Sequence, residues 1–209
     1  MPRSELVETP HGRCLIVDIA DDADAVAGAL VGAEVALAAS LGPLRRRELA
    51  AGRAALRGLL GEPVAILADD RGAPILPAGW VGSISHKGAR AAALLAAAGD
   101  GFVGLDLELA APPRQPIEQR ILTPRERAEI RDGRDVTLRF AIKEAIYKAI
   151  DPIVRRYVGF TEVEVELAIA AGGSCTVSVL DPARLPVIVE AWWQERDGFW
   201  LATARATRR

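Results

Sequence analysis

The sequence predicts an α+β protein made of two similar subdomains, each a long helix packed on a small antiparallel sheet. A helical segment followed by short strand-like runs occurs twice along the 209 residues, once in each half. The strand-like runs are joined by turn signals, as in antiparallel sheets. We expect the subdomains at 1–99 and 100–209, related by a pseudo-two-fold axis, with a cleft between them of the kind that commonly binds a ligand.

In the first half, RCLIVDI at 13–19 is typical of a strand. A helix is predicted over 43–60, because Pro43 suits the first helical position and Gly61 suits the end. Further strands are predicted at 63–68, at 80–85 and at 90–97. The turn AAGDG at 97–101 then leads into the second half.

The second half begins with a predicted strand at 102–108. The sequence TPRE at 123–126 fits a capping box at the start of a short helix. Asp135 is expected to cap a longer helix that runs to about Ile150 and is stopped by Pro152. The strands then resume at 161–167 and in SCTVSVL, VIVEAWWQ and FWLATARA, with a hairpin turn at Asp197-Gly198.

Composition narrows the class of protein. With 50% hydrophobic residues the chain can bury a core, and a net charge of −2 argues against a general nucleic-acid binder. Cys14 and Cys175 lie in apolar runs and are expected to be reduced. Two histidines without a Cys/His cluster disfavour zinc, so any metal would be bound by oxygen. The absence of an apolar signal region and of a long apolar run predicts a cytoplasmic protein with no membrane partner.

Two motifs in the second half carry acidic residues. Within GLDLE at 104–108, Asp106 and Glu108 share one face of the strand with Cα atoms about 6–7 Å apart, so they can bind one hard cation. The alternative interpretation of these two carboxylates is that they are ordinary charges at a solvent-facing strand end. In RFAIKEAIYK at 139–148, Glu144 and Lys148 are i,i+4 neighbours; alone they would be interpreted as a surface ion pair, and Lys143 as a solvated lysine.

The first half carries basic groups. In GSISHKG at 82–88, Ser85, His86 and Lys87 are donors at a strand end and could bind phosphate, although a lone histidine is as often structural. No nucleophile elbow supports a serine hydrolase. The helix at 43–60 bears several arginines that suit phosphate but could equally form a solvated basic face. These residues, with one more in a nearby loop, are Arg45, Arg46, Arg47, Arg53, Arg57 and Arg71.

Taken together, GSISH, GLDLE and RFAIKEAIYKA at 139–149 resemble the 4′-phosphopantetheinyl transferases, in particular the larger two-subdomain type of the surfactin and enterobactin pathways. GRAALRGLLG at 52–61 and RGAPILP at 71–77 support the resemblance, which covers residues 43 to about 165. It implies transfer of the phosphopantetheine arm of coenzyme A to a serine of an apo acyl, peptidyl or aryl carrier protein, with release of 3′,5′-ADP. Such a protein would serve siderophore, polyketide or nonribosomal peptide synthesis as a monomer.

The resemblance also implies roles for individual residues. Magnesium, or manganese in its place, would be bound by Asp106, Glu108 and Glu144. Glu144 is the expected general base, although Glu126 and a metal-bound water remain alternatives, and Lys148 would neutralise the pyrophosphate. The residues implied to contact coenzyme A are Arg45, Arg53, Arg71, Ser85, His86, Lys143 and Lys148.

Other functions use the same residues. A magnesium-dependent nucleotide or coenzyme A hydrolase would release nucleotide without any carrier. A non-catalytic coenzyme A-binding module would keep its affinity when Glu144 is neutralised. The shorter trimeric transferases of fatty-acid synthesis share the chemistry, but the repeated order of helix and strands argues against them.

Overall fold

The internal contacts of the chain divide it into unit 1 (Met1–Gly99) and unit 2 (Asp100–Arg209). The computed structural model describes residues 3–167 and 172–209. Met1 and Pro2, part of the segment expected to lack a signal region, lie outside the described residues. The α+β class and the two antiparallel sheets with helices are confirmed, whereas the pseudo-two-fold relation and the cleft stay predictions.

Unit 1 contains a four-stranded antiparallel sheet in the order β1-β2-β4-β3. β4 is the most apolar of these strands and is almost completely buried, which suits its position between β2 and β3. The N-terminal strand β1 was not predicted, because SELVET is short and mostly polar. The strands are β1 (Ser4–Thr9), β2 (Gly12–Asp18), β3 (Trp80–Lys87) and β4 (Arg90–Ala97).

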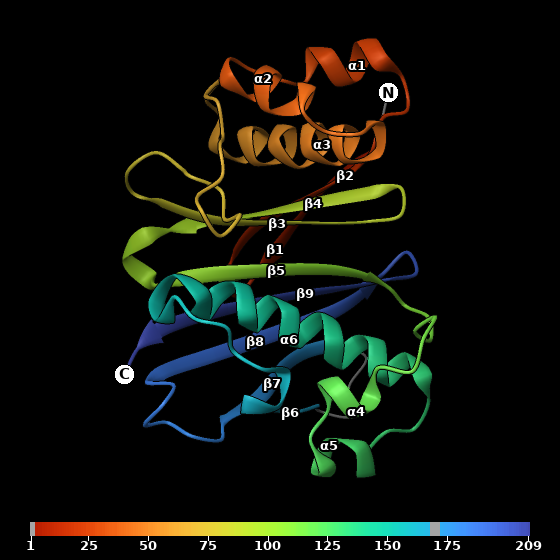
Figure 1. Ribbon diagram of the computed structural model, residues 1–209, viewed down its shortest axis with the longest axis vertical. Helices are drawn as coiled ribbons and strands as arrows, with labels where there is room; N and C mark the ends of the chain where they lie inside the picture. Colours follow the sequence, from red (N-terminus) through yellow and green to blue (C-terminus); the bar gives the residue numbers. More distant parts are fainter. Residues whose placement is uncertain (1–2, 168–171) are drawn as a thin grey trace. The chain divides into compact units, whose positions relative to one another are not determined.

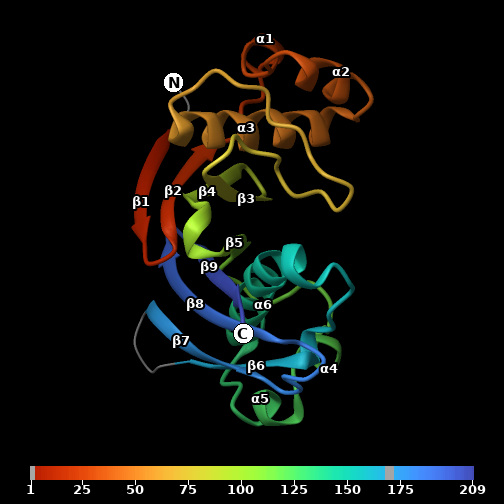
Figure 2. The same cartoon turned by 90° about the vertical axis from the view of Figure 1, so that its left-hand side faces the viewer.

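The long helix α3 (Pro43–Leu60) covers this sheet as predicted. Its apolar residues pack on β4, and Leu56 of α3 and Leu95 of β4 are both buried in this contact. Gly61 ends the helix in the left-handed conformation, with φ of 74°. The short helices α1 (Ala23–Gly28) and α2 (Ala33–Ala39) lie on the other side of α3 from the sheet (Figures 1 and 2).

The prediction of a strand at 63–68 is wrong. This segment is extended, but its only ladder contact in the described structure is an isolated bridge between Ala68 and Pro74. Side chains bond its backbone instead: the Ile66 N–H donates to Glu34 Oε1 (2.7 Å), and the Ile66 carbonyl accepts from Arg53 Nε (3.2 Å). Because these bonds replace a neighbouring strand, an apolar run with strand-like composition stays outside the sheet.

Unit 2 contains a five-stranded antiparallel sheet in the order β5-β9-β8-β7-β6, with helix α6 (Gly133–Val154) packed on β5, β9 and β8. Figure 1 shows α6 lying along this sheet. The strands are β5 (Phe102–Leu109), β6 (Val163–Glu166), β7 (Gly172–Val179), β8 (Val187–Arg196) and β9 (Phe199–Arg208), and the remaining short helices are α4 (Glu118–Ile121) and α5 (Pro124–Ala128).

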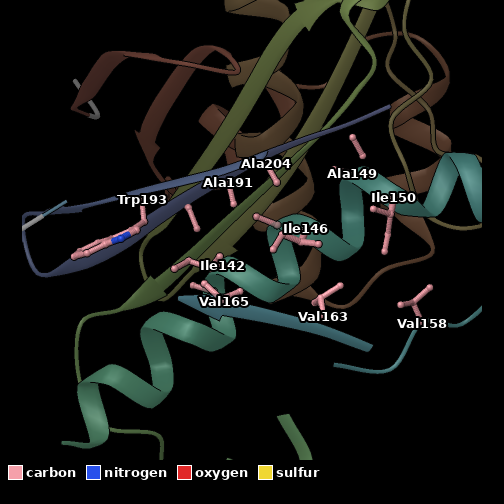
Figure 3. Packing of buried hydrophobic residues seen from close by; sticks show 14 of the residues in the cluster. Ile142, Ile146, Ala149, Ile150, Val158, Val163, Val165, Ala191, Trp193 and Ala204 are labelled. Carbon is pink, nitrogen blue, oxygen red and sulfur yellow. The ribbon is translucent and has the colours of Figure 1, made fainter. Parts of the chain in front are cut away.

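The core of unit 2 lies between α6 and the sheet (Figure 3). Ile142, Ile146 and Ile150 project from successive turns of the helix, so they form one buried stripe. Small residues such as Ala191 and Ala204 on the strands let the helix approach closely. At one end Trp193 and Trp200 meet edge to face, with ring centroids 5.5 Å apart.

Both ends of α6 differ from the prediction. Asp132, not Asp135, is the N-cap, and its carboxylate accepts from the backbone N–H groups of Arg134 and Asp135. Asp135 instead lies in the first turn and pairs with Arg131. Pro152 does not stop the helix, which continues to Val154. A proline removes only one N–H, and the bond from Arg155 N to Asp151 O (2.8 Å) closes the helix beyond it.

The predicted helix cap and the predicted hairpin turn are confirmed. The capping box forms at the start of α5, and Asp197 and Gly198 take positive φ values of 46° and 77°, as a two-residue hairpin turn between β8 and β9 requires. Cys14 and Cys175 are both free thiols, and burial raises the pKa of Cys175 to about 12. Among the described residues, no helix has the length and apolar character needed to cross a membrane.

Candidate active site

The acidic strand β5 lies directly against α6 because Gly104 has no side chain. A Cβ at this position would lie 1.9 Å from the Ala145 carbonyl oxygen and 2.7 Å from the Ala149 nitrogen. Side chains two residues apart on a strand point the same way, so Asp106 and Glu108 follow Gly104 on the α6 side. The close approach thus brings both carboxylates of β5 to the helix that carries Glu144 and Lys148.

Lys148 is bound to the strand. Its ammonium donates to Asp106 Oδ1 (2.8 Å) and to the Leu105 carbonyl oxygen (2.8 Å). Asp106 is only 5% exposed, whereas Glu108, Glu144 and Lys148 are half-buried. The sequence offered Glu144 as the i,i+4 partner of Lys148; the structure shows in addition a bond between helix and strand that the sequence did not predict.

The electrostatics of Glu144 reflect the crowding of acidic groups. Burial raises the pKa of the Glu144 carboxyl, and the negative charges of Asp106 and Glu108 raise it further, while Lys148 opposes them. The Lys148 ammonium therefore does not offset the effect of burial and of the two neighbouring carboxylates on Glu144. This imbalance is what a hard divalent cation would relieve, since such cations prefer carboxylate oxygens.

A preformed metal cage is nevertheless absent from the part of the chain that the structure describes: no group of three or more His, Cys, Asp or Glu residues is arranged to hold an ion. In this arrangement the Lys148 ammonium supplies the positive charge beside Asp106. The chemistry of the donors Asp106, Glu108 and Glu144 fits magnesium, but their predicted role as joint ligands stays a prediction.

Lys143 does not have the role that the sequence suggested. It is 1% exposed, and its ammonium donates to Glu126 Oε2 (2.6 Å) and to the carbonyl oxygens of Ile121 and Phe160 (both 2.9 Å). Burial lowers the pKa of Lys143, although Glu126 opposes this shift. With all three donors engaged inside unit 2, Lys143 has none left for a phosphate, and we do not retain it as a coenzyme A contact.

Glu126 is equally enclosed. Besides Lys143, its oxygens accept from the backbone N–H groups of Thr123 (2.8 Å) and Val165 (2.8 Å), and the residue is 1% exposed. It therefore joins α5, β6 and α6 and is not accessible as a general base. The capping box was readable in the sequence, but its pairing with Lys143 joins residues 17 apart and had no sequence signal.

In unit 1 the structure brings Arg45 and His86 together around a residue that sequence analysis missed. Glu48 Oε2 accepts from Arg45 (3.2 Å), Glu48 Oε1 lies 3.2 Å from His86 Nδ1, and Arg45 lies 3.5 Å from His86 Nε2. The only signal for Glu48 in the sequence was its position three residues after Arg45 on a predicted helix.

The other predicted basic contacts lie elsewhere. Arg53 is half-buried and bonds the Ile66 carbonyl, and burial lowers its pKa. Arg71 is exposed in a turn held by Asp69 Oδ1, and Ser85 is buried on the opposite face of β3 from His86. The roles of these three residues stay predictions.

The remaining arginines of α3 are structural. Arg46 donates to the carbonyl oxygens of Ala38 and Leu41, Arg47 pairs with Asp21, and Arg57 pairs with the fully buried Glu34. The basic helix is therefore neither a uniformly solvated face nor a continuous phosphate site. Arg45 is the member that faces His86.

Known families match both halves of the chain. Residues 33–96 match the family model described as the 4′-phosphopantetheinyl transferase N-terminal domain, and residues 102–204 match the 4′-phosphopantetheinyl transferase superfamily. A curated relative, the 4′-phosphopantetheinyl transferase Svp of Streptomyces mobaraensis, is 32% identical over 81% of this chain and 72% of its own. The chain belongs to the 4′-phosphopantetheinyl transferase superfamily.

Two more relatives carry the same description. Npt of Nocardia iowensis is 35% identical over 62% of this chain, and PptT of Mycobacterium tuberculosis is 34% identical over 54%. The matched region spans 63% of the Nocardia protein and 52% of the mycobacterial one. Among solved structures, the holo-[acyl-carrier-protein] synthase of Helicobacter pylori in complex with coenzyme A matches 51% of this chain at 17% identity, with a TM-score of 0.42.

Proposed function

We propose that this chain transfers the 4′-phosphopantetheine arm of coenzyme A to a serine hydroxyl of an apo carrier protein and releases 3′,5′-ADP. Membership of the superfamily supports the reaction class. The observation in this molecule that carries the proposal is the acidic group Asp106, Glu108 and Glu144: burial and the charges of Asp106 and Glu108 raise the pKa of the Glu144 carboxyl, and Lys148 opposes them. Such a group suits a cation that neutralises phosphate oxygens.

The proposed roles follow from the surroundings of each residue. Asp106, Glu108 and Glu144 would hold magnesium, which when bound offsets charge on the pyrophosphate. Lys148, whose ammonium is already held at Asp106 and at the Leu105 carbonyl, would neutralise the phosphate that leaves with ADP. Arg45 and His86 of unit 1 are the proposed contacts for the adenosine 3′-phosphate, and Arg53, Arg71 and Ser85 remain further candidates.

The chemistry at the carrier serine requires a base. The serine oxygen forms a bond to the phosphorus that carries the pantetheine arm, the bond from that phosphorus to the ADP oxygen breaks, and the electron pair leaves with 3′,5′-ADP. Glu144 is the proposed acceptor of the serine proton, because a carboxyl group with a raised pKa binds a proton more readily. Glu126 is not accessible for this role, since its oxygens accept from Lys143, Thr123 and Val165.

The test uses a panel of apo acyl, peptidyl and aryl carriers incubated with coenzyme A, magnesium and the protein. We expect at least one carrier to gain the mass of one phosphopantetheine with an equal amount of 3′,5′-ADP. Glu144→Gln should lower the rate on the order of 100-fold. Glu190→Gln, which removes an exposed carboxylate from the same unit, should leave the rate unchanged. Nucleotide release without a modified carrier would instead indicate a hydrolase.

A further inference from the structure

The cluster of Arg45, Glu48 and His86 has an inner and an outer part. The Glu48 side chain is 11% exposed, whereas those of His86 and Arg45 are 31% and 67% exposed. The carboxylate thus lies beneath the two basic groups and contacts each with a different oxygen, at 3.2 Å to His86 Nδ1 and 3.2 Å to Arg45. Glu48 is placed to hold the more exposed side chains of Arg45 and His86.

The backbone fixes this position. Gly52 lies one helical turn after Glu48 on α3, and Ile84 lies two residues before His86 on the same face of β3. A Cβ at Gly52 would lie 2.6 Å from Ile84 Cγ2, so helix and strand approach more closely here than a side chain would allow. This contact sets the spacing at which Glu48 meets His86.

The contact with Glu48 determines how the His86 ring is oriented. With Nδ1–H directed at the carboxylate, the second ring nitrogen, Nε2, lies on the side of Arg45, 3.5 Å away. A phosphate oxygen that binds at Nε2 needs a proton on that nitrogen. A ring that donates from Nδ1 to Glu48 and from Nε2 to a phosphate oxygen is the doubly protonated form of histidine. Arg45 then adds a second charge-assisted donor to the same phosphate.

We propose that Glu48 is a positioning residue that orients Arg45 and His86 to bind a terminal phosphate monoester. This inference rests on the proposed function, in which that group is the 3′-phosphate of coenzyme A. Glu48 does not contact the phosphate and acts through His86 and Arg45. A plain surface ion pair would predict a small effect on stability and none that depends on the ligand's phosphate.

The test compares two ligands that differ only in this phosphate. Binding of 3′,5′-ADP and of AMP is measured by titration calorimetry for the wild type, Glu48→Gln, Glu48→Asp and, as the matched control, Glu62→Gln, which removes an exposed carboxylate from the same unit. We expect the wild type to bind 3′,5′-ADP more tightly than AMP. Glu48→Gln should reduce that preference about tenfold, as expected for weakening a charge-assisted contact.

Two further results would support the proposal: retention of the wild-type preference by Glu62→Gln, and partial recovery of it by Glu48→Asp. In transfer assays Glu48→Gln should raise KM for coenzyme A, with a smaller effect on kcat and on KM for 3′-dephospho-coenzyme A. Equal losses for both ligands, or a wild type without preference for 3′,5′-ADP, would overturn it. Failure of the proposed function would be distinguishable from failure of this proposal, because carriers would then stay unmodified whichever nucleotide the protein prefers.

Discussion

The contact between Gly104 and α6 gives the sharpest stability prediction. In Gly104→Ala the new Cβ would lie 1.9 Å from the Ala145 carbonyl oxygen, whereas Cβ contacts below 3.0 Å essentially never occur. The obstacle is helix backbone, not a side chain that can rotate away. Strand and helix must therefore separate by roughly 1 Å, which is the overpacking that costs about 1–3 kcal/mol or more.

A loss of about 3 kcal/mol should lower Tm by roughly 6–12 °C for a chain of this size. Thermal unfolding followed by circular dichroism measures this loss. Gly99→Ala is the matched control, because a Cβ there meets nothing within 4 Å and the residue has no positive φ. Transfer activity of the surviving folded protein should also fall, since the separation moves Asp106 away from Lys148 and Glu144. An unchanged Tm in Gly104→Ala would show that the close contact between β5 and α6 is not needed for stability.

Three further predictions concern buried or titrating groups. Lys143→Met should cost about 3–5 kcal/mol because it leaves the Glu126 charge buried without its ammonium, and the double variant Lys143→Met with Glu126→Gln should recover part of that loss in urea unfolding. Burial and the charges of Asp106 and Glu108 raise the pKa of the Glu144 carboxyl. The contribution of Glu144 to the free energy of unfolding is therefore fully present below its ordinary pKa of 4.5 and is lost as the pH rises through the pKa of the folded state. Glu144→Gln should thus melt above the wild type at neutral pH and together with it in acid; a constant difference would contradict this. Cys175, with a pKa of about 12, should react with a thiol reagent at pH 8 more slowly than an ordinary thiol, and equal rates would contradict its burial.

Local rules predicted much of the fold. Helix α3 was readable because Pro43 and Gly61 mark its ends, and the β8–β9 hairpin because Asp197-Gly198 favours positive φ at both positions. The segment at 63–68 misled the same rules, because its strand-like composition does not show that Glu34 and Arg53 bond its backbone. Long-range contacts of this kind leave no local pattern.

In the candidate site, too, local patterns were predicted from the sequence and long-range contacts were not. Asp106, Glu108 and Glu144 were found by spacing and by family resemblance, and the structure shows that Gly104 of the same motif marks close packing on α6. Lys143 was misjudged because a lysine on a helix is usually solvated, and its partners at Glu126, Ile121 and Phe160 are distant in sequence. Glu48 was missed because its partner His86 is on a strand 38 positions later.

The central claim is that this chain modifies a carrier protein. The most direct measurement is the intact mass of apo carriers after incubation with coenzyme A and magnesium, with wild-type protein, Glu144→Gln and Glu190→Gln side by side. We expect wild type and Glu190→Gln to add one phosphopantetheine to a carrier serine and Glu144→Gln to add it far more slowly. A panel of acyl, peptidyl and aryl carriers that all keep their apo mass, or equal modification by Glu144→Gln, would contradict it.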